Sequence, residues 1–145
     1  MPSTMKGKKI LVVEDELPLR SALFDILTYE GFDVLQAEDG KEGLVLAGRY
    51  HPDLILLDIV MPVMDGLTML KKLRSTDSYG AHVPVVILSN LSLYKEDIHK
   101  DVSATEPAFY LVKTDWTLPD VVKKVKLVLS RPPAEPAKTP QVGEG

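Results

Sequence analysis

Acidic side chains follow two short apolar runs of this sequence, and acids placed in this way can bind a metal ion. Glu14 and Asp15 come directly after the run Lys9–Val13, and Asp58 comes directly after the run Leu54–Leu57. Carboxylates brought close together repel one another unless a cation joins them, and Mg²⁺ prefers oxygen ligands. If the two runs end at one place in the fold, the sequence predicts a site for Mg²⁺ or Mn²⁺ there.

A hydroxyl group and an ammonium group follow two further apolar runs. Ser89 comes after Val85–Leu88, and Lys113 comes after Phe109–Val112. The carboxyl ends of parallel strands lie at one edge of an open α/β sheet, and ligands bind there where the strand order reverses. We therefore expect three carboxylates, one hydroxyl and one ammonium group to converge at that edge.

The elements that must position these side chains alternate between short β-branched runs and longer stretches of helical periodicity. This alternation predicts an α/β fold with an open, doubly wound, five-stranded parallel sheet between two layers of helices. Four of the five candidate strands are nearly unbroken apolar runs, which is typical of parallel strands covered on both faces. The expected strands are Lys9–Val13, Asp33–Ala37, Leu54–Leu57, Val85–Leu88 and Phe109–Val112.

Helix start and stop signals occupy the segments between the strands. Pro18 fits the first turn of a helix that Gly31 ends, and Thr117 with Asp120 resembles a capping box. We interpret Glu16, like Asp120, as a turn or cap residue rather than a ligand. The other expected helices are 41–50, about 67–74 and 95–102, and Ser78-Tyr79-Gly80 is expected to break the chain before the fourth strand.

Length and composition limit the function classes. The 145 residues carry a net charge of −4, with 45% apolar residues and no cysteine, so disulfide scaffolds, thiolate zinc sites and a basic nucleic-acid surface are not expected. No apolar run is long enough for a membrane span or a signal peptide, and we expect a cytoplasmic protein without a membrane partner. The predicted organisation is a polar lead-in (1–8), one domain (9–130) and a Pro-rich tail or linker (131–145).

Four motifs of this sequence resemble those of the receiver domain of two-component response regulators. They are KILVVEDE (9–16), PDLILLDIVMPVMDG (52–66), PVVILS (84–89) and YLVK (110–113). They occur in the order found in that family, and the resemblance covers the chain from about Lys8 to Ser130. It implies a flavodoxin-like (βα)5 fold of the type found in CheY, and it implies a signalling protein rather than an enzyme.

The resemblance implies a role for each of the clustered acids. Asp58 resembles the phosphoacceptor, whose carboxylate takes a phosphoryl group from a sensor histidine kinase or a phosphotransfer protein. Asp15 and Asp58 are expected to bind Mg²⁺ directly, and Glu14 more weakly or through water. The backbone carbonyl of Val60 would complete the set of metal ligands from the protein.

The resemblance also implies a conformational switch. Lys113 is expected to pair with Asp58 and later with the phosphoryl group, to which the Ser89 hydroxyl would donate a hydrogen bond. Tyr110 resembles the aromatic residue that moves as this hydroxyl shifts. The output surface would be the face formed by the helix 95–102, the fifth strand and the last helix, and it would control a protein target.

The sequence departs from the family pattern at several positions, and it leaves alternative functions open. Thr114 stands where a proline is usual, and the apolar Val60 and Leu91 predict a long-lived phosphoryl group. The alternatives are the receiver of a longer regulator with a DNA-binding or enzymatic output domain, and a pseudo-receiver that acts without phosphorylation. We expect a monomer or a phosphorylation-dependent homodimer that makes no direct contact with nucleic acid.

Overall fold

Five parallel strands form one sheet in the order β2-β1-β3-β4-β5. The computed structural model describes residues 6–58, 66–89, 109–112 and 117–130, with the backbone alone described for residues 89 and 109–112. This topology confirms the predicted doubly wound sheet. Strands β3 and β4 are each one residue longer than expected because they include Asp58 and Ser89. The strands are β1 (Lys9–Val13), β2 (Asp33–Ala37), β3 (Leu54–Asp58), β4 (Val85–Ser89) and β5 (Phe109–Val112).

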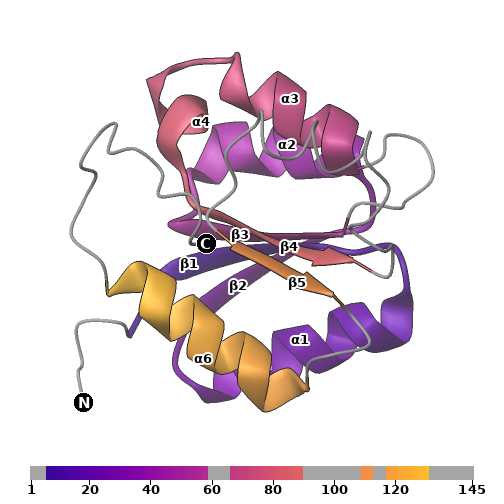
Figure 1. Ribbon diagram of the computed structural model, residues 1–145, viewed down its shortest axis with the longest axis vertical. Coiled ribbons are helices and arrows are strands. Elements are labelled where there is room, and N and C mark those ends of the chain that lie inside the picture. Colours follow the sequence, from indigo (N-terminus) through magenta and orange to yellow (C-terminus); the bar gives the residue numbers. More distant parts are fainter. Residues whose placement is uncertain (1–5, 59–65, 90–108, 113–116, 131–145) are drawn as a thin grey trace.

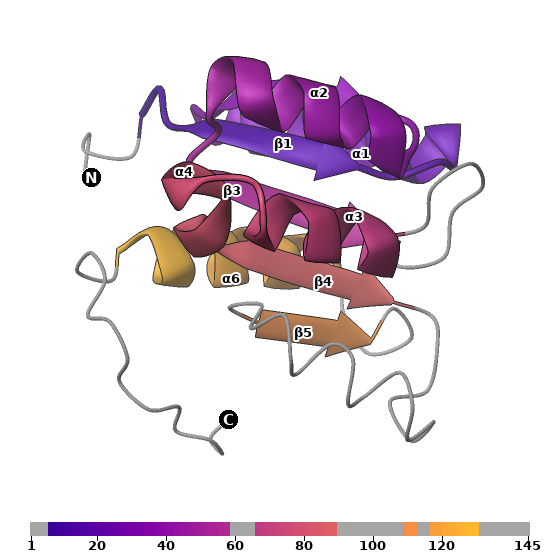
Figure 2. The ribbon, with the colours of Figure 1, turned by 90° about the horizontal axis from the view of Figure 1, so that it is seen from above.

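Helices cover both faces of this sheet, as Figures 1 and 2 show. One face carries α2 (Gly40–Tyr50), α3 (Gly66–Arg74) and the short α4 (Ser78–His82), and the other carries α1 (Leu17–Tyr29) and α6 (Leu118–Leu129). Within the described part of the chain, the architecture is therefore the expected arrangement of three layers.

Alternating residues of the central strands fill two separate cores. Leu11 and Val13 of β1 lie in the core under α2 and α3, whereas Ile10 and Val12 lie in the core under α1 and α6. The same alternation runs through β3 and β4, whose residues 54–58 and 85–88 are all buried. Burial on both faces explains why these strands are continuous apolar runs in the sequence.

The register places the carboxyl ends of the strands side by side. Val13 pairs with Ala37 on β2 and with Leu57 on β3, and Asp58 pairs with Leu88 on β4. Between β1 and β3 the winding of the chain changes direction, which creates a crevice at the carboxyl end of an open sheet. The acids that follow β1 and end β3 therefore meet at this switch point.

The predicted helix signals occupy the expected places, with one difference in detail. Pro18 lies in the first turn of α1, and Gly31 follows the helix with a φ of +101°. Thr117 and Asp120 form a reciprocal capping box at α6, as predicted. Glu16 lies at the N-cap position of α1, but its side chain makes no capping hydrogen bond.

The prediction that Ser78-Tyr79-Gly80 breaks the chain is wrong, because these residues begin helix α4. The Asp77 side chain accepts a hydrogen bond from the Gly80 backbone N–H at 2.8 Å and caps the helix. A Cβ atom at Gly80 would collide with the carbonyl oxygen of Leu73, so the glycine permits close packing of α4 on α3. The close packing of Gly80 on Leu73 of α3 therefore helps to stabilise this segment as a helix, and the sequence pattern around Gly80 does not reveal that contact.

Tyr79 joins α4 to the segment that enters β3. Its hydroxyl donates a hydrogen bond to the Pro52 carbonyl at 2.6 Å, and its ring stacks on His51 with centroids 4.2 Å apart. Burial raises the pKa of Tyr79 above its ordinary value, and the charge of Asp53 raises it further. This cluster lies at the amino end of the sheet, opposite the acids.

Several sequence predictions fall outside the described residues. They are the helix 95–102, the loop at Thr114 and the Pro-rich tail 131–145. Among the residues that the structure describes, no helix combines the length and the apolar character needed to cross a bilayer.

Candidate functional site

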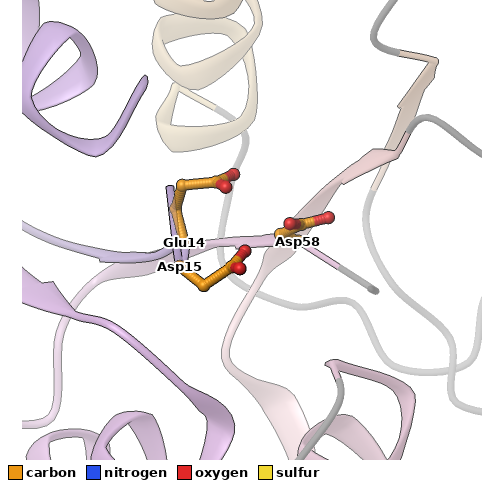
Figure 3. Close-up of side chains that lie close together, drawn as sticks. All are labelled: Glu14, Asp15 and Asp58. Atoms are coloured by element: carbon orange, nitrogen blue, oxygen red, sulfur yellow. The ribbon is translucent and has the colours of Figure 1, made fainter. Parts of the chain in front are cut away.

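Three carboxylates from two neighbouring strands meet at the carboxyl end of the sheet. Glu14 and Asp15 follow β1, Asp58 ends β3, and one oxygen from each lies within 4.8 Å of the others. Figure 3 shows the three side chains grouped at this edge. The structure thus brings together the three acids that the sequence proposed as ligands.

Two of these acids are buried, which is costly for charged groups. Glu14 is 1% exposed and Asp58 is 4% exposed, whereas Asp15 is half-buried. Among the described residues, Glu14 and Asp58 are the buried polar or charged ones. Charged side chains are rarely buried unless they are paired or bind a cation. The site therefore concentrates negative charge where solvent screening is weak.

A loop of three residues between β1 and α1 positions the first two acids. The Glu14 backbone N–H donates to the Ala37 carbonyl at 3.0 Å, so the ladder with β2 continues one residue past β1. The Glu14 carboxylate accepts a hydrogen bond from the Glu16 backbone N–H at 3.1 Å. Glu14 therefore helps to organise the start of α1 as well as contributing charge to the site.

Arg20 is a part of this site that the sequence analysis missed. Its Nη1 donates to the carbonyl oxygens of Glu14, at 2.9 Å, and of Asp15, at 3.5 Å. The sequence does contain a signal for it, since an arginine one helical turn after an acidic loop can reach back to that loop. The signal is weak because arginines on the first turn of a helix usually extend into solvent.

The other predicted site residues are placed by backbone alone or lie outside the described residues. Ser89 is the last residue of β4, directly after the residue that pairs with Asp58, so its backbone lies on the strand beside the acids. Tyr110 lies on β5, opposite Ile87. Lys113 and Val60 lie outside the described residues, so their predicted roles stay predictions.

The donor set fits a hard divalent cation. All three side chains offer carboxylate oxygens, and their spacing allows each to contribute one ligand atom. Mg²⁺ binds through one or two carboxylates, retained waters and phosphate oxygens, rather than through a cage of protein ligands alone. A half-buried Asp15 leaves one side of the cluster accessible to such ligands. The arrangement is able to hold a cation beside the Asp58 carboxylate.

Comparisons with known proteins agree on the type of domain. The family model of the response regulator receiver domain matches residues 10–123. The transcriptional regulatory protein PrrA of Mycobacterium tuberculosis is 35% identical over 131 residues, which cover 90% of this chain and 54% of PrrA. The chain spans about half the length of the curated relatives MprA, PrrA and RpaA that it matches.

This chain also matches solved structures of similar fold, and the match covers nearly the whole length of those structures. The receiver domain of Francisella response regulator 1452 has a TM-score of 0.74 and 28% identity, with 85% of this chain and 97% of that chain covered. The chemotaxis protein CheY4 of Vibrio cholerae has a TM-score of 0.76 and 27% identity, with 84% and 98% covered.

Proposed function

Because this chain belongs to the response regulator receiver domain family, and so takes part in phosphorelay signalling, we propose that Asp58 is its phosphoacceptor. One observation carries this assignment: Asp58 ends a central strand, is 4% exposed, and lies with two further acids within 4.8 Å. A nucleophile in a phosphoryl-transfer site needs a cation beside it, because charge gathers on the equatorial oxygens of the phosphoryl group. The neighbouring acids can hold that cation.

The proposed reaction moves one phosphoryl group. A carboxylate oxygen of Asp58 attacks the phosphorus of a phosphohistidine, a P–O bond forms, the P–N bond breaks, and its electron pair returns to the imidazole nitrogen. The product is an acyl phosphate on Asp58. With acetyl phosphate as donor, the same attack releases acetate. In both cases the protein contributes the nucleophile and its orientation rather than a separate acid or base.

Asp15, Asp58 and Glu14 are the proposed Mg²⁺ ligands from the described residues, with the Val60 carbonyl as a further one. The bound ion would neutralise charge on the phosphoryl oxygens. Asp15 is half-buried and Glu14 is buried, so Asp15 is proposed as the direct ligand and Glu14 as a weaker or water-mediated one. Mn²⁺ is proposed as a substitute because it accepts the same oxygen ligands.

Lys113 and Ser89 are proposed to respond to the phosphoryl group. Val112 pairs with Ser89, so Lys113 follows the strand position beside Ser89 at the carboxyl end of the sheet. An ammonium and a hydroxyl group there would pair with phosphoryl oxygens. Tyr110, on the strand next to β4, is proposed to transmit the change to the output face.

The proposed partners are a sensor histidine kinase or phosphotransfer protein upstream and a protein target or attached output unit downstream. Curated relatives are described as transcriptional regulators and as a methylesterase, which makes regulation of an output domain a reasonable proposal for the natural protein. A pseudo-receiver is not favoured, because the acidic cluster is assembled. A cytoplasmic location, typical of response regulators, is part of the proposal.

The test is phosphorylation by acetyl phosphate with and without Mg²⁺, measured as the intact mass of the protein. The proposal expects one added phosphoryl group in the presence of Mg²⁺ and none for Asp58→Asn. The exposed Asp33 at the amino end of β2 offers a matched control, and Asp33→Asn is expected to label as the wild type does. Mg²⁺-independent labelling, or equal labelling of Asp58→Asn, would refute the proposal.

A further inference from the structure

The Arg20 side chain connects the first turn of α1 to the acidic loop (residues 14–16) through hydrogen bonds. Nη1 of its guanidinium group donates to the Glu14 carbonyl at 2.9 Å and, over a longer 3.5 Å, to the Asp15 carbonyl. Arg20 is half-buried, so these hydrogen bonds form in a partly dehydrated setting. Hydrogen bonds from a charged donor are stronger than those between neutral groups.

The contacts of Arg20 go to backbone and not to the acidic side chains. The hydrogen bonds found for its guanidinium group run to carbonyl oxygens of the two ligand residues. An arginine that acted by neutralising the cluster would be expected to contact a carboxylate oxygen instead. The geometry therefore indicates a role in fixing the course of the loop.

Backbone hydrogen bonds also restrain this loop, since the Glu14 N–H donates to the Ala37 carbonyl and the Arg20 N–H donates to the Glu16 carbonyl. Glu16 occupies the N-cap position of α1 without a side-chain capping bond, and its backbone N–H instead donates to the Glu14 carboxylate. Arg20 adds a side-chain restraint to the carbonyl groups of the two residues that carry these carboxylates, Glu14 and Asp15. If these peptides rotated, the carboxylates would leave the position in which their oxygens lie within 4.8 Å of Asp58.

We propose that Arg20 is a positioning residue that holds the Glu14 and Asp15 peptides so that the carboxylates stay oriented for Mg²⁺. This inference rests on the proposed function, since it concerns the same metal site. Partners of metal ligands typically change metal affinity by about 10–100-fold when they are removed. Arg20 acts through its ligand residues and does not itself touch the ion.

The sign of the effect separates positioning from charge. Removal of a nearby positive charge strengthens the binding of a divalent cation several-fold, by Coulomb's law, if charge is the only contribution of Arg20. Removal of a positioning residue weakens the binding instead. The two roles therefore predict opposite changes in Mg²⁺ affinity for Arg20→Ala. Arg20→Lys keeps the charge but replaces the planar fork of donors by a single ammonium group. A charge role predicts unchanged Mg²⁺ affinity for this variant, and a positioning role predicts weaker binding.

The experiment is calorimetric titration of the purified full chain with MgCl₂, without any phosphodonor. Arg20→Ala is expected to raise the Mg²⁺ Kd at least about tenfold, and Arg20→Lys about threefold or more. Arg49, exposed in the last turn of α2, is the matched control, and Arg49→Ala is expected to bind Mg²⁺ within about twofold of the wild type. Circular dichroism confirms that each variant is folded, and Arg20→Lys decides the question if Arg20→Ala does not fold.

An independent readout is the backbone amide resonance of Glu16, which reports its hydrogen bond to Glu14. The proposal expects this resonance to shift in both Arg20 variants before Mg²⁺ is added. Unchanged or tighter Mg²⁺ binding by the Arg20 variants would overturn the positioning role while leaving the proposed metal site intact. No Mg²⁺ binding by the wild type would overturn both.

Discussion

The two ends of the sheet are built in opposite ways. At the carboxyl end, three carboxylates gather within 4.8 Å, and two of them are buried. At the amino end, Tyr79 stacks on His51 and donates to the Pro52 carbonyl, while Arg74 donates to the carbonyls of Gly80 and Val83. Like charges lie close together at the first end, whereas Tyr79 and Arg74 at the second end donate hydrogen bonds to backbone carbonyls.

The difference indicates how one fold serves both function and stability. Clustered carboxylates cost folding free energy when no cation is bound, and the same charge would give the proposed Mg²⁺ site its affinity. The aromatic and hydrogen-bonded contacts at the amino end stabilise the fold without taking part in the chemistry. Substitutions at the two ends should therefore separate stability from phosphorylation.

The largest effect is expected from Tyr79→Ala at the amino end. This substitution removes the ring stack on His51 and the hydrogen bond to Pro52, and the free energy of unfolding should fall by about 2–3 kcal/mol. Urea unfolding measures the loss. Labelling by acetyl phosphate should persist at a temperature where the variant is folded, and loss of labelling by the folded variant would contradict the separation of the two ends.

Mg²⁺ should act at the carboxyl end with an effect of similar size. At a hundredfold excess over its Kd, Mg²⁺ is expected to raise the unfolding free energy of the wild type by about 2.7 kcal/mol. Asp15→Asn should abolish most of this gain. In the absence of Mg²⁺ the same variant should be more stable than the wild type by about 0.5–1 kcal/mol, because one of three like charges is gone. Thermal unfolding with and without Mg²⁺ checks both signs.

Gly80→Ala should destabilise the amino end through sterics alone. The new methyl group would meet the Leu73 carbonyl, a backbone atom that cannot rotate away, and a loss of about 2 kcal/mol is expected. The neighbouring Ala81 is exposed on the same helix, so Ala81→Ser serves as a control with little change. Equal stability of the Gly80→Ala protein and the wild type would mean that α4 packs less closely than described.

The smallest effect is expected from Tyr79→Phe, and it should depend on pH. At neutral pH the lost hydrogen bond should cost about 1 kcal/mol. Because the pKa of Tyr79 is raised in the folded state, its contribution is complete below the unfolded pKa and declines as the pH rises above about 10. The stability difference between wild type and Tyr79→Phe should therefore narrow by about 0.8 kcal/mol between about pH 8 and pH 10.5. A constant difference in urea unfolding would contradict this.

The sequence predicted the sheet well because burial on both faces leaves a strong local signal. The runs that became β1, β3 and β4 are apolar at nearly every position, and the helix caps at Thr117 and Asp120 depend on residues three apart. The convergence of the acids followed from one topological rule, that the carboxyl ends of parallel strands share an edge.

Tertiary contacts account for what the sequence could not predict. Helix α4 has a local cap at Asp77, but its packing on α3 depends on Gly80, which lets it approach, and on Arg74, which binds the carbonyls of Gly80 within the helix and of Val83 just after it. The contact of Arg20 with the acidic loop leaves only a weak signal in the sequence, because an arginine on the first turn of a helix usually extends into solvent. The sequence predicts a chain break at Gly80 and assigns no role to Arg20 or Arg74.

The most direct test of the account is to locate the phosphoryl group by chemical trapping. Protein treated with acetyl phosphate and Mg²⁺ is reduced with borohydride, digested, and analysed by peptide mass spectrometry. We predict modification at Asp58, at the carboxyl end of β3, and none at Glu14 or Asp15. Modification at another residue, or none in folded protein that binds Mg²⁺, would contradict it.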